Sequence, residues 1–167
     1  MPLFGGSRDV AMFRQFNFEM AKHHTRNDVD IYKINLEATP PNIYGESEEK
    51  VYFNPVRVPC LVDLSNSESL TSEFGTDKTQ VATYSFTRDV LVEAKLYIEI
   101  GDIIGYNGSY WEINNTTNDK LFYNRDPNLP QYDIDVLGNK YGWNVEFICT
   151  THLLRTTKVN LNDTDLK

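Results

Sequence analysis

Apolar residues follow two different periods along the chain. Over residues 8–24 they recur every three or four positions, which predicts a helix, whereas from residue 28 onward they alternate with polar residues, which predicts strands. We therefore expect an N-terminal helical segment, residues 1–27, followed by a single β-barrel domain, residues 28–167. The predicted fold class is mainly β, a small antiparallel β-barrel or sandwich with one N-terminal helix and long loops.

The predicted helix carries an apolar stripe on one face. At about 100° per residue its members fall within roughly 120° of one another, and we expect this face to pack on the barrel. Phe18 lies well outside the stripe, as does Met12, so the helix either contacts a second surface or leaves apolar side chains to be covered by a local loop. The stripe consists of Val10, Phe13, Phe16 and Met20.

The strand pattern accounts for about six strands. Pro55 and Pro59 confine one of these strands to a sheet edge or a bulge. Asn107-Gly108 predicts a two-residue hairpin turn with positive φ at both positions. The faces expected to point inward include Ala82, Tyr84 and Phe86, and later Val145, Phe147, Cys149 and Thr151. The alternating segments are 30–36, 56–64, 81–88, the hairpin 101–113, and 143–154.

The start of the hairpin has its own chemistry. Gly101 permits a tight turn, and the carboxylate of Asp102 can accept backbone N–H groups before the apolar pairing begins. Tyr110 and Trp111 are adjacent in a strand and point to opposite faces. We expect one of them to fill the barrel; the other packs either within the domain or on a neighbouring molecule.

Two segments are predicted to be long loops. Residues 65–79 are rich in Ser, Thr and Glu and include Gly75, and residues 114–139 contain Pro127 and Pro130. Loops of this length in a small β domain usually carry function or become ordered on assembly.

Charge and cysteine content exclude several classes of protein. The 167 residues carry a formal net charge of −8, so tight nucleic-acid binding is not expected, because it needs clustered Lys and Arg. The acidity lies in the middle of the chain: residues 28–75 sum to −6, whereas residues 1–27 sum to +2. Cys60 and Cys149 each sit within an apolar alternation, which predicts buried thiols in a reducing compartment. We expect neither a signal peptide nor a membrane span.

No arrangement of residues points to catalysis. The adjacent His23 and His24 cannot chelate one ion from a helix as an i, i+4 pair does, and the carboxylate runs around Glu48 and Asp133 are typical of a solvated surface. No nucleophile-elbow or phosphate-loop pattern occurs. We therefore predict no catalytic, metal-binding or cofactor-binding residues, and a protein that is not an enzyme.

The order of motifs resembles the neck proteins of tailed bacteriophages, the head-completion or head-closure (stopper) group. The motif residues within the matching region, which extends from Asn42 to Arg155, are Tyr44, Gly45, Glu46, Gly101, Asp102, Tyr106, Trp111, Glu112 and His152. The matching pieces are Asn42-Ile43-Tyr44-Gly45-Glu46, Val51-Tyr52-Phe53-Asn54-Pro55-Val56-Arg57-Val58, Tyr84-Ser85-Phe86-Thr87-Arg88-Asp89, Glu99-Ile100-Gly101-Asp102-Ile103-Ile104-Gly105-Tyr106 with Tyr110-Trp111-Glu112-Ile113, and Val145-Glu146-Phe147-Ile148-Cys149-Thr150-Thr151-His152-Leu153-Leu154-Arg155.

This resemblance implies a virion structural protein, made in the cytoplasm of a bacterial host and located in the neck that connects head and tail. It implies a homo-oligomeric ring, sixfold or twelvefold, that closes the channel of the portal or adaptor ring and contacts the tail terminator or tail tube on its other side. Genomic DNA would pass through the lumen without specific binding, helped by acidic walls that repel phosphate. No cofactor and no membrane are implied.

Several functional alternatives stay open at this stage. The protein could be the tail terminator or completion protein of the same virion region. It could also be a small ligand-binding β domain whose Tyr and Trp side chains stack on sugars, and an acid–base enzyme has only scattered carboxylates in its favour. The candidates for subunit contacts are Phe4, Met12, Phe18, Tyr110, Arg125 and Asp126.

A chelator tests the expectation that no metal contributes to the fold. We expect excess EDTA to leave the melting temperature unchanged, because no ligand spacing that could hold a structural ion occurs in the sequence. Calorimetry with and without the chelator measures this directly. A decrease of several degrees would contradict the prediction.

Overall fold

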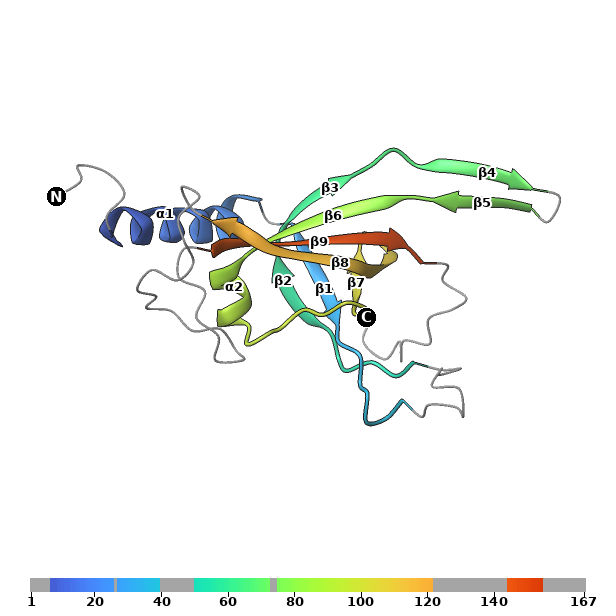
Figure 1. Cartoon of the computed structure of the whole chain (residues 1–167), viewed down its shortest axis with the longest axis horizontal. Coiled ribbons are helices and arrows are strands. Elements are labelled where there is room, and N and C mark those ends of the chain that lie inside the picture. Colours follow the sequence, from blue (N-terminus) through green and yellow to red (C-terminus); the bar gives the residue numbers. More distant parts are fainter. Residues whose placement is uncertain (1–6, 26, 40–49, 73–74, 122–143, 155–167) are drawn as a thin grey trace.

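The computed structural model describes residues 7–25, 27–39, 50–72, 75–121 and 144–154, which form a mainly β protein (Figure 1). This confirms the predicted fold class. Along the chain the elements are α1 (Ser7–Glu19), the π-helical turn η1 (Met20–Thr25), β1 (Asp28–Tyr32), β2 (Val56–Pro59), β3 (Leu61–Leu64), β4 (Glu68–Ser72), β5 (Gly75–Thr79), β6 (Val81–Thr87), α2 (Arg88–Glu93), β7 (Ile103–Tyr106), β8 (Ser109–Leu121) and β9 (Asn144–Leu153).

Seven strands form one curled antiparallel half-barrel. Their order is β2-β1-β7-β8-β9-β6-β3, and each neighbouring pair is antiparallel. The two edge strands, β2 and β3, are consecutive in sequence and are separated only by Cys60, whose N–H donates to the carbonyl of Asn27 at 2.9 Å. The chain thus crosses from one edge of the sheet to the other at Cys60. Because of this crossing, the sheet curls around a single core.

The inward faces of the strands confirm the predicted alternation. Ala82, Tyr84 and Phe86 of β6 are buried, and every second residue of β9 from Val145 to Thr151 is buried with them. A fully buried apolar side chain stabilises the fold by about 1.5–3 kcal/mol relative to an exposed one, so this interior provides most of the driving force for folding. The predicted edge position near Pro59 is also confirmed, because β2 ends there.

The predicted hairpin is present with the predicted turn. β7 pairs with β8 from Tyr106↔Ser109 to Ile103↔Glu112, and Asn107 and Gly108 between them have φ values of 50° and 74°. Both angles lie in the left-handed region, which Asn and Gly adopt at the lowest cost. The hairpin therefore sets the register of the middle of the sheet through local sequence alone.

Helix α1 packs with a face other than the predicted one. Phe18 lies against the barrel core and Ala21 is buried, whereas the predicted packing residues Phe13, Phe16 and Met20 are exposed. The side chain of Val10 lies outside the described residues. The expectation that the apolar stripe packs on the barrel is therefore wrong.

Electrostatics explain which face of α1 docks. Arg14 forms an ion pair with Asp89, and its Nε donates to Asp89 Oδ2 at 3.0 Å. One turn beyond Phe18, Lys22 Nζ donates to Glu93 Oε1 at 2.8 Å. Arg14, Phe18 and Lys22 are spaced four residues apart and so share one face of the helix. Their acidic partners belong to α2, a short helix that the sequence analysis did not predict.

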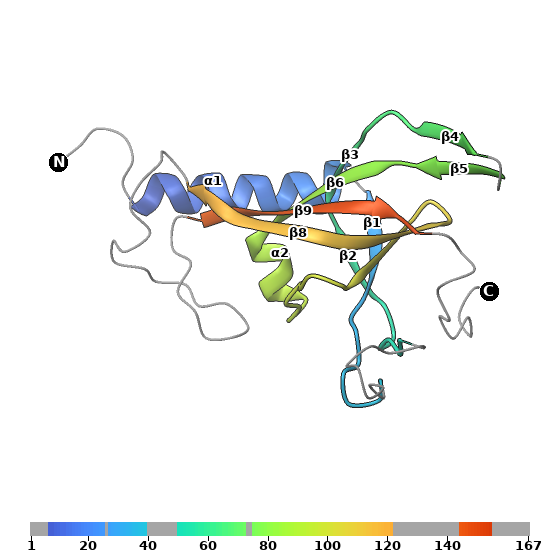
Figure 2. The ribbon, with the colours of Figure 1, turned by 45° about the vertical axis from the view of Figure 1, so that its right-hand side comes forward.

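The first predicted loop is a β-hairpin instead. Residues 65–79 contain β4 and β5, which pair antiparallel from Glu68↔Thr79 to Ser72↔Gly75. They form a separate two-stranded ribbon that extends away from the barrel in the direction of β3 and β6 (Figure 2). The segment escaped prediction because it is mainly polar, so its sequence has no visible alternation of hydrophobicity.

The prediction of a second loop over residues 114–139 is wrong in its first part. Strand β8 continues to Leu121 and pairs with β9 through several register shifts, so residues 114–121 are strand rather than loop. Residues 122–139 of the predicted loop lie outside the described residues. With β4 and β5, the described part of the chain contains nine strands, whereas about six were expected.

Side chains on the two faces of α1 should respond differently to substitution by alanine. We expect Phe18→Ala to lower the free energy of unfolding by about 2 kcal/mol, because it removes a ring that contacts the core. Phe16→Ala is the matched control and should change it by no more than about 0.5 kcal/mol. Urea denaturation of the two variants measures the difference. Equal effects would show that α1 does not dock through Phe18.

Candidate interaction surface

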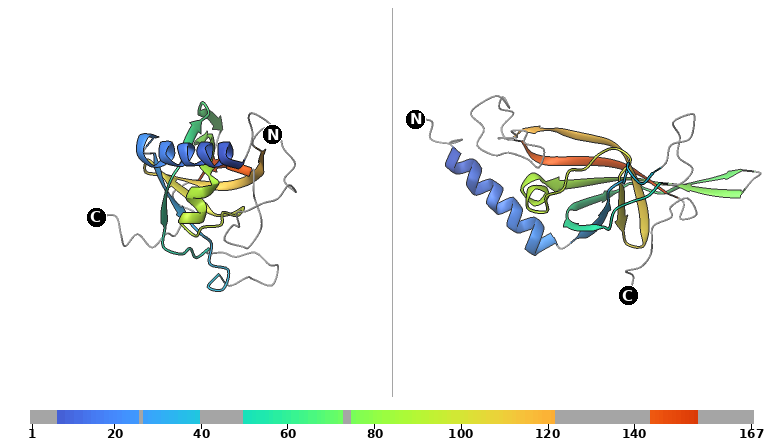
Figure 3. Two further views of the ribbon diagram at one scale, coloured as in Figure 1. Left: turned by 90° about the vertical axis from the view of Figure 1, so that its left-hand side faces the viewer. Right: turned by 90° about the horizontal axis from the view of Figure 1, so that it is seen from below.

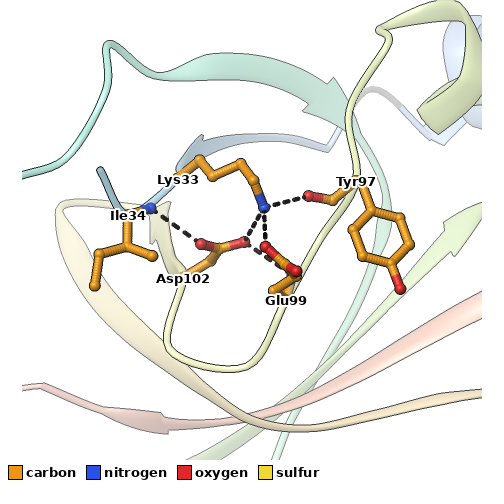
Figure 4. A network of polar contacts seen from close by, with 5 residues as sticks. All are labelled: Lys33, Ile34, Tyr97, Glu99 and Asp102. Atoms are coloured by element: carbon orange, nitrogen blue, oxygen red, sulfur yellow. Dashed lines mark hydrogen bonds and ion pairs between the residues drawn. The ribbon is translucent and has the colours of Figure 1, made fainter. Parts of the chain in front are cut away.

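The Gly-Asp motif forms a buried polar network at the start of the hairpin (Figure 4). Gly101 has a φ of 94°, which turns the chain so that the next residue, Asp102, points inward. The Asp102 carboxylate is fully buried and accepts the N–H groups of Ile34 at 3.1 Å and Glu99 at 2.8 Å. The predicted role of Asp102 as an acceptor of backbone N–H groups is thereby confirmed.

Lys33 completes this network from the other side. Its Nζ donates to the Tyr97 carbonyl at 2.9 Å and to Glu99 Oε2 at 2.6 Å, and lies 3.5 Å from Asp102 Oδ2. Burial raises the pKa of Asp102, against the opposing effects of the two backbone donors and of Lys33. The network joins the chain after β1 to the segment before β7, and its fully buried member, Asp102, has no exposed surface.

The aromatic motif residues belong to the barrel interior. The ring of Tyr84 lies 6.2 Å from that of Tyr106 and 6.3 Å from that of Trp111, measured between centroids, and both pairs have an edge-on geometry. Such pairs add to the stability gained from burial. Trp111 is therefore the residue that fills the barrel. Tyr110, the adjacent residue, is half-buried and packs edge-on against Tyr32, with 6.0 Å between ring centroids.

The last two motif residues lie on the outside of the sheet. Glu112 and His152 are direct cross-strand partners of β8 and β9. Glu112 accepts a hydrogen bond from Lys50 Nζ at 3.0 Å, and His152 Nδ1 lies 2.7 Å from Asn114 Oδ1. His152 is thus a hydrogen-bonded strand histidine. Of the motif residues, Tyr44, Gly45 and Glu46 lie outside the described residues.

The two cysteines are free and buried, as the alternation predicted. Burial raises the pKa of Cys60 to about 12 and that of Cys149 further. A thiol with such a pKa is almost entirely protonated at neutral pH, and the thiolate is the reactive form. Both cysteines therefore act as small apolar core residues.

Three of the six candidates for subunit contacts can be placed. Met12 is exposed on α1, Phe18 packs on the core with Lys22 Nζ 5.1 Å from its ring centroid, and Tyr110 is half-buried. The structure therefore leaves Met12 available to a partner and uses Phe18 within the domain. Phe4, Arg125 and Asp126 lie outside the described residues.

The strongest feature of the surface is an apolar row on α1. Met12, Phe16 and Met20 are 61%, 58% and 40% exposed. Their spacing of four residues places them on one side of the helix, about 200° from the side that carries Arg14 and Phe18. We call these three residues the outer stripe. Periodicity alone had already placed two of them together on an apolar face, but it had assigned that face to the core.

A hollow of about 450 Å³ lies beside the outer stripe, between η1 and the end of the barrel. Leu61 of β3 is exposed at its wall, and Phe16 and Met20 of the outer stripe line it too. Exposed apolar patches that continue across two elements usually mark contact sites. The other residues that line the hollow are Asn17, Ala21, Thr25, Ser85, Phe86, Thr87, Val145 and Glu146.

The described residues show neither a metal site nor a membrane helix. No group of three or more His, Cys, Asp or Glu side chains within them could hold an ion, and none of their helices is long and apolar enough to cross a bilayer. No protein-family model matches the chain, and no curated protein does. The surface geometry and the motif resemblance are therefore the basis for any functional assignment.

The Asp102 network makes a prediction about pH. Asp102→Asn should destabilise the protein by about 1–3 kcal/mol, because the amide NH2 group can only donate and must face one of the two backbone N–H groups, whereas both oxygens of the carboxyl group can accept even when it is protonated. A raised carboxyl pKa means that the folded state favours the protonated form, so the contribution of Asp102 to stability is largest at acidic pH and falls as pH rises above the ordinary value near 3.8.

The stability difference between wild type and Asp102→Asn should accordingly be larger at pH 4 than at pH 7. Urea denaturation of both proteins at the two pH values measures it. Comparing the two proteins at each pH cancels the titration of other groups. A difference that grows with pH would contradict the assigned direction of the pKa shift.

Proposed function

We propose that this protein is a ring-forming structural component of a tailed-phage neck, where it closes the portal or adaptor channel and joins head to tail. The observation that carries the proposal is the outer stripe, which leaves large apolar side chains of an ordered helix exposed on the isolated chain. Surfaces of this kind are covered in an assembly. The resemblance of the motif order from Asn42 to Arg155 to that of phage neck proteins is the reason for proposing this particular assembly.

The charge distribution is consistent with copies that meet end to end. The segment containing α1 carries +2 and residues 28–75 carry −6, so the helix of one copy and the acidic part of the next attract each other and favour a defined orientation. An acidic ring lumen would also repel DNA phosphates, so that the genome passes without binding. The tail terminator position in the same region would use the same geometry with different neighbours.

A second candidate function is favoured by the hollow beside the outer stripe. A volume of about 450 Å³ with apolar walls and a few polar groups falls within the range of small-molecule sites. The protein would then be a small ligand-binding β domain that stays monomeric. Self-association of the purified chain distinguishes this candidate from the ring.

The outer stripe provides the test of the proposed function. We expect the double variant Met12→Gln, Phe16→Gln to keep the wild-type melting temperature, because neither side chain contacts the core, and to lose self-association and incorporation into virus particles. Native mass spectrometry, together with analysis of purified particles, measures both. Deletion of the helix is a poor test, since Phe18 and Ala21 belong to the packed structure.

The matched control makes the same chemical change elsewhere on the surface. Leu36 and Ile100 are 75% and 62% exposed, and Leu36→Gln, Ile100→Gln should assemble like wild type. If the outer-stripe variant assembles as well as this control, the stripe is not the interface. If the wild-type chain is monomeric at high concentration and is absent from particles, the proposed function is wrong.

A further inference from the structure

We propose that the ribbon formed by β4 and β5 is a strand-pairing arm, and that β5 of one copy pairs with β4 of the next to form a continuous antiparallel collar. This inference rests on the proposed function in one respect, since it requires copies of the chain to meet. It concerns a different part of the molecule, because the ribbon and α1 lie at opposite ends (Figure 3).

The ribbon stands apart from the barrel. Its two strands have five residues each, pair only with one another among the described residues, and form their own sheet. One edge of β4 and one edge of β5 are therefore unpaired within the described part of the chain. An isolated two-stranded ribbon is marginally stable in water, and each unpaired edge presents backbone groups that can accept another strand.

The base of the ribbon is firmly held, which fixes the direction in which the arm points. Ser65 donates through its N–H and its Oγ to the carbonyl of Val81, at 3.0 and 2.7 Å, and its Oγ accepts the Val81 N–H at 3.1 Å. The Gln80 amide donates to the Ser65 carbonyl at 2.8 Å, and the Leu153 N–H donates to the Gln80 carbonyl at 3.0 Å. The ribbon thus continues the strand direction of the barrel.

The ribbon lacks most of the features that block edge pairing. Natural edge strands are protected by proline, by lysine, by bulges or by a covering element. Neither β4 nor β5 contains proline, their pairing shows no register shift, and their charged residues are Glu68, Asp77 and Lys78. Most of the other residues are Ser, Thr and Gly, so pairing with another strand would rest mainly on backbone hydrogen bonds.

Symmetry selects the partner strand. Copies related by rotation about an axis along the ribbon keep the direction of every strand, so β5 of one copy meets β4 of the next in antiparallel orientation. Both edges have the same length, and a closed ring pairs all of them, which is how closed sheets remove their edges. Pairing of β4 with β4 in a two-fold dimer would leave both β5 edges open. A second copy of this chain is therefore the partner that satisfies both edges.

Replacing the ribbon tests its part in assembly. In the variant, Asn-Gly replaces residues 67–79 and leaves Ser65 and Gln80 at the base. We expect it to fold with an unchanged near-ultraviolet circular dichroism spectrum and to lose the wild-type oligomer. Amide hydrogen exchange in β4 and β5 should slow when the wild-type chain assembles. If the variant forms the wild-type oligomer, or if exchange is equal in the free and the assembled chain, the proposed strand pairing is wrong, whereas the ring proposal is unaffected.

Cysteine pairing tests which edges meet. The native Cys60 and Cys149 are buried, so Ser69→Cys on β4 and Thr79→Cys on β5 each provide a single accessible thiol at an exposed position. With a short bis-maleimide, a mixture of the two variants should give several-fold more cross-linked dimer than either variant alone. Leu36→Cys mixed with Thr79→Cys is the control. Equal yields from Ser69→Cys alone, or none from any sample, would overturn the proposed pairing.

Discussion

The crossing of the chain at Cys60 is the constraint on which the rest of the structure depends. Because β2 and β3 are separated by this one residue and lie at opposite edges of the seven-stranded sheet, the sheet must curl until those edges approach each other. Curling turns one face of every strand inward, so each strand needs a period-two pattern with apolar residues on that face. Burial of the thiol, rather than its chemistry, explains a cysteine at this point.

The two ends of the curled sheet determine which parts of the chain lie outside it. At one end, α2 presents Asp89 and Glu93, and these carboxylates attract the face of α1 that carries Arg14 and Lys22. The pair of Arg14 and Asp89 is partly buried and that of Lys22 and Glu93 is exposed, and ion pairs of these two kinds position an element more than they stabilise it. Because α1 docks through this charged face, its more apolar face is left in solvent. At the other end, the strands β3 and β6 continue beyond the core as the mainly polar ribbon of β4 and β5.

Sequence reasoning succeeded where a single physical effect determines the structure. Alternation placed Tyr84 and Phe86 in the core, and Asn107-Gly108 determined the turn, because burial and positive φ act on those residues locally. It failed for α1, where apolarity and charge favoured different faces and the acidic partners lay in an unpredicted helix. It also failed for residues 65–79, because a polar ribbon leaves no trace in hydrophobic periodicity. Two of the three residues of the outer stripe, Phe16 and Met20, were therefore assigned to the core, whereas Met12 was a candidate for subunit contacts.

The outer stripe and the ribbon would contribute to assembly through different kinds of interaction. The outer stripe buries apolar area, a contribution that is non-directional and depends little on salt, so it supplies affinity without setting orientation. Strand pairing depends on register and direction and gains little net free energy per hydrogen bond in water, so it supplies geometry. The outer stripe and the ribbon both lie outside the curled sheet, so they can contact other copies without replacing any of its strand pairings. Features at opposite ends of one rigid body allow each copy to contact its neighbours without distorting the core between them.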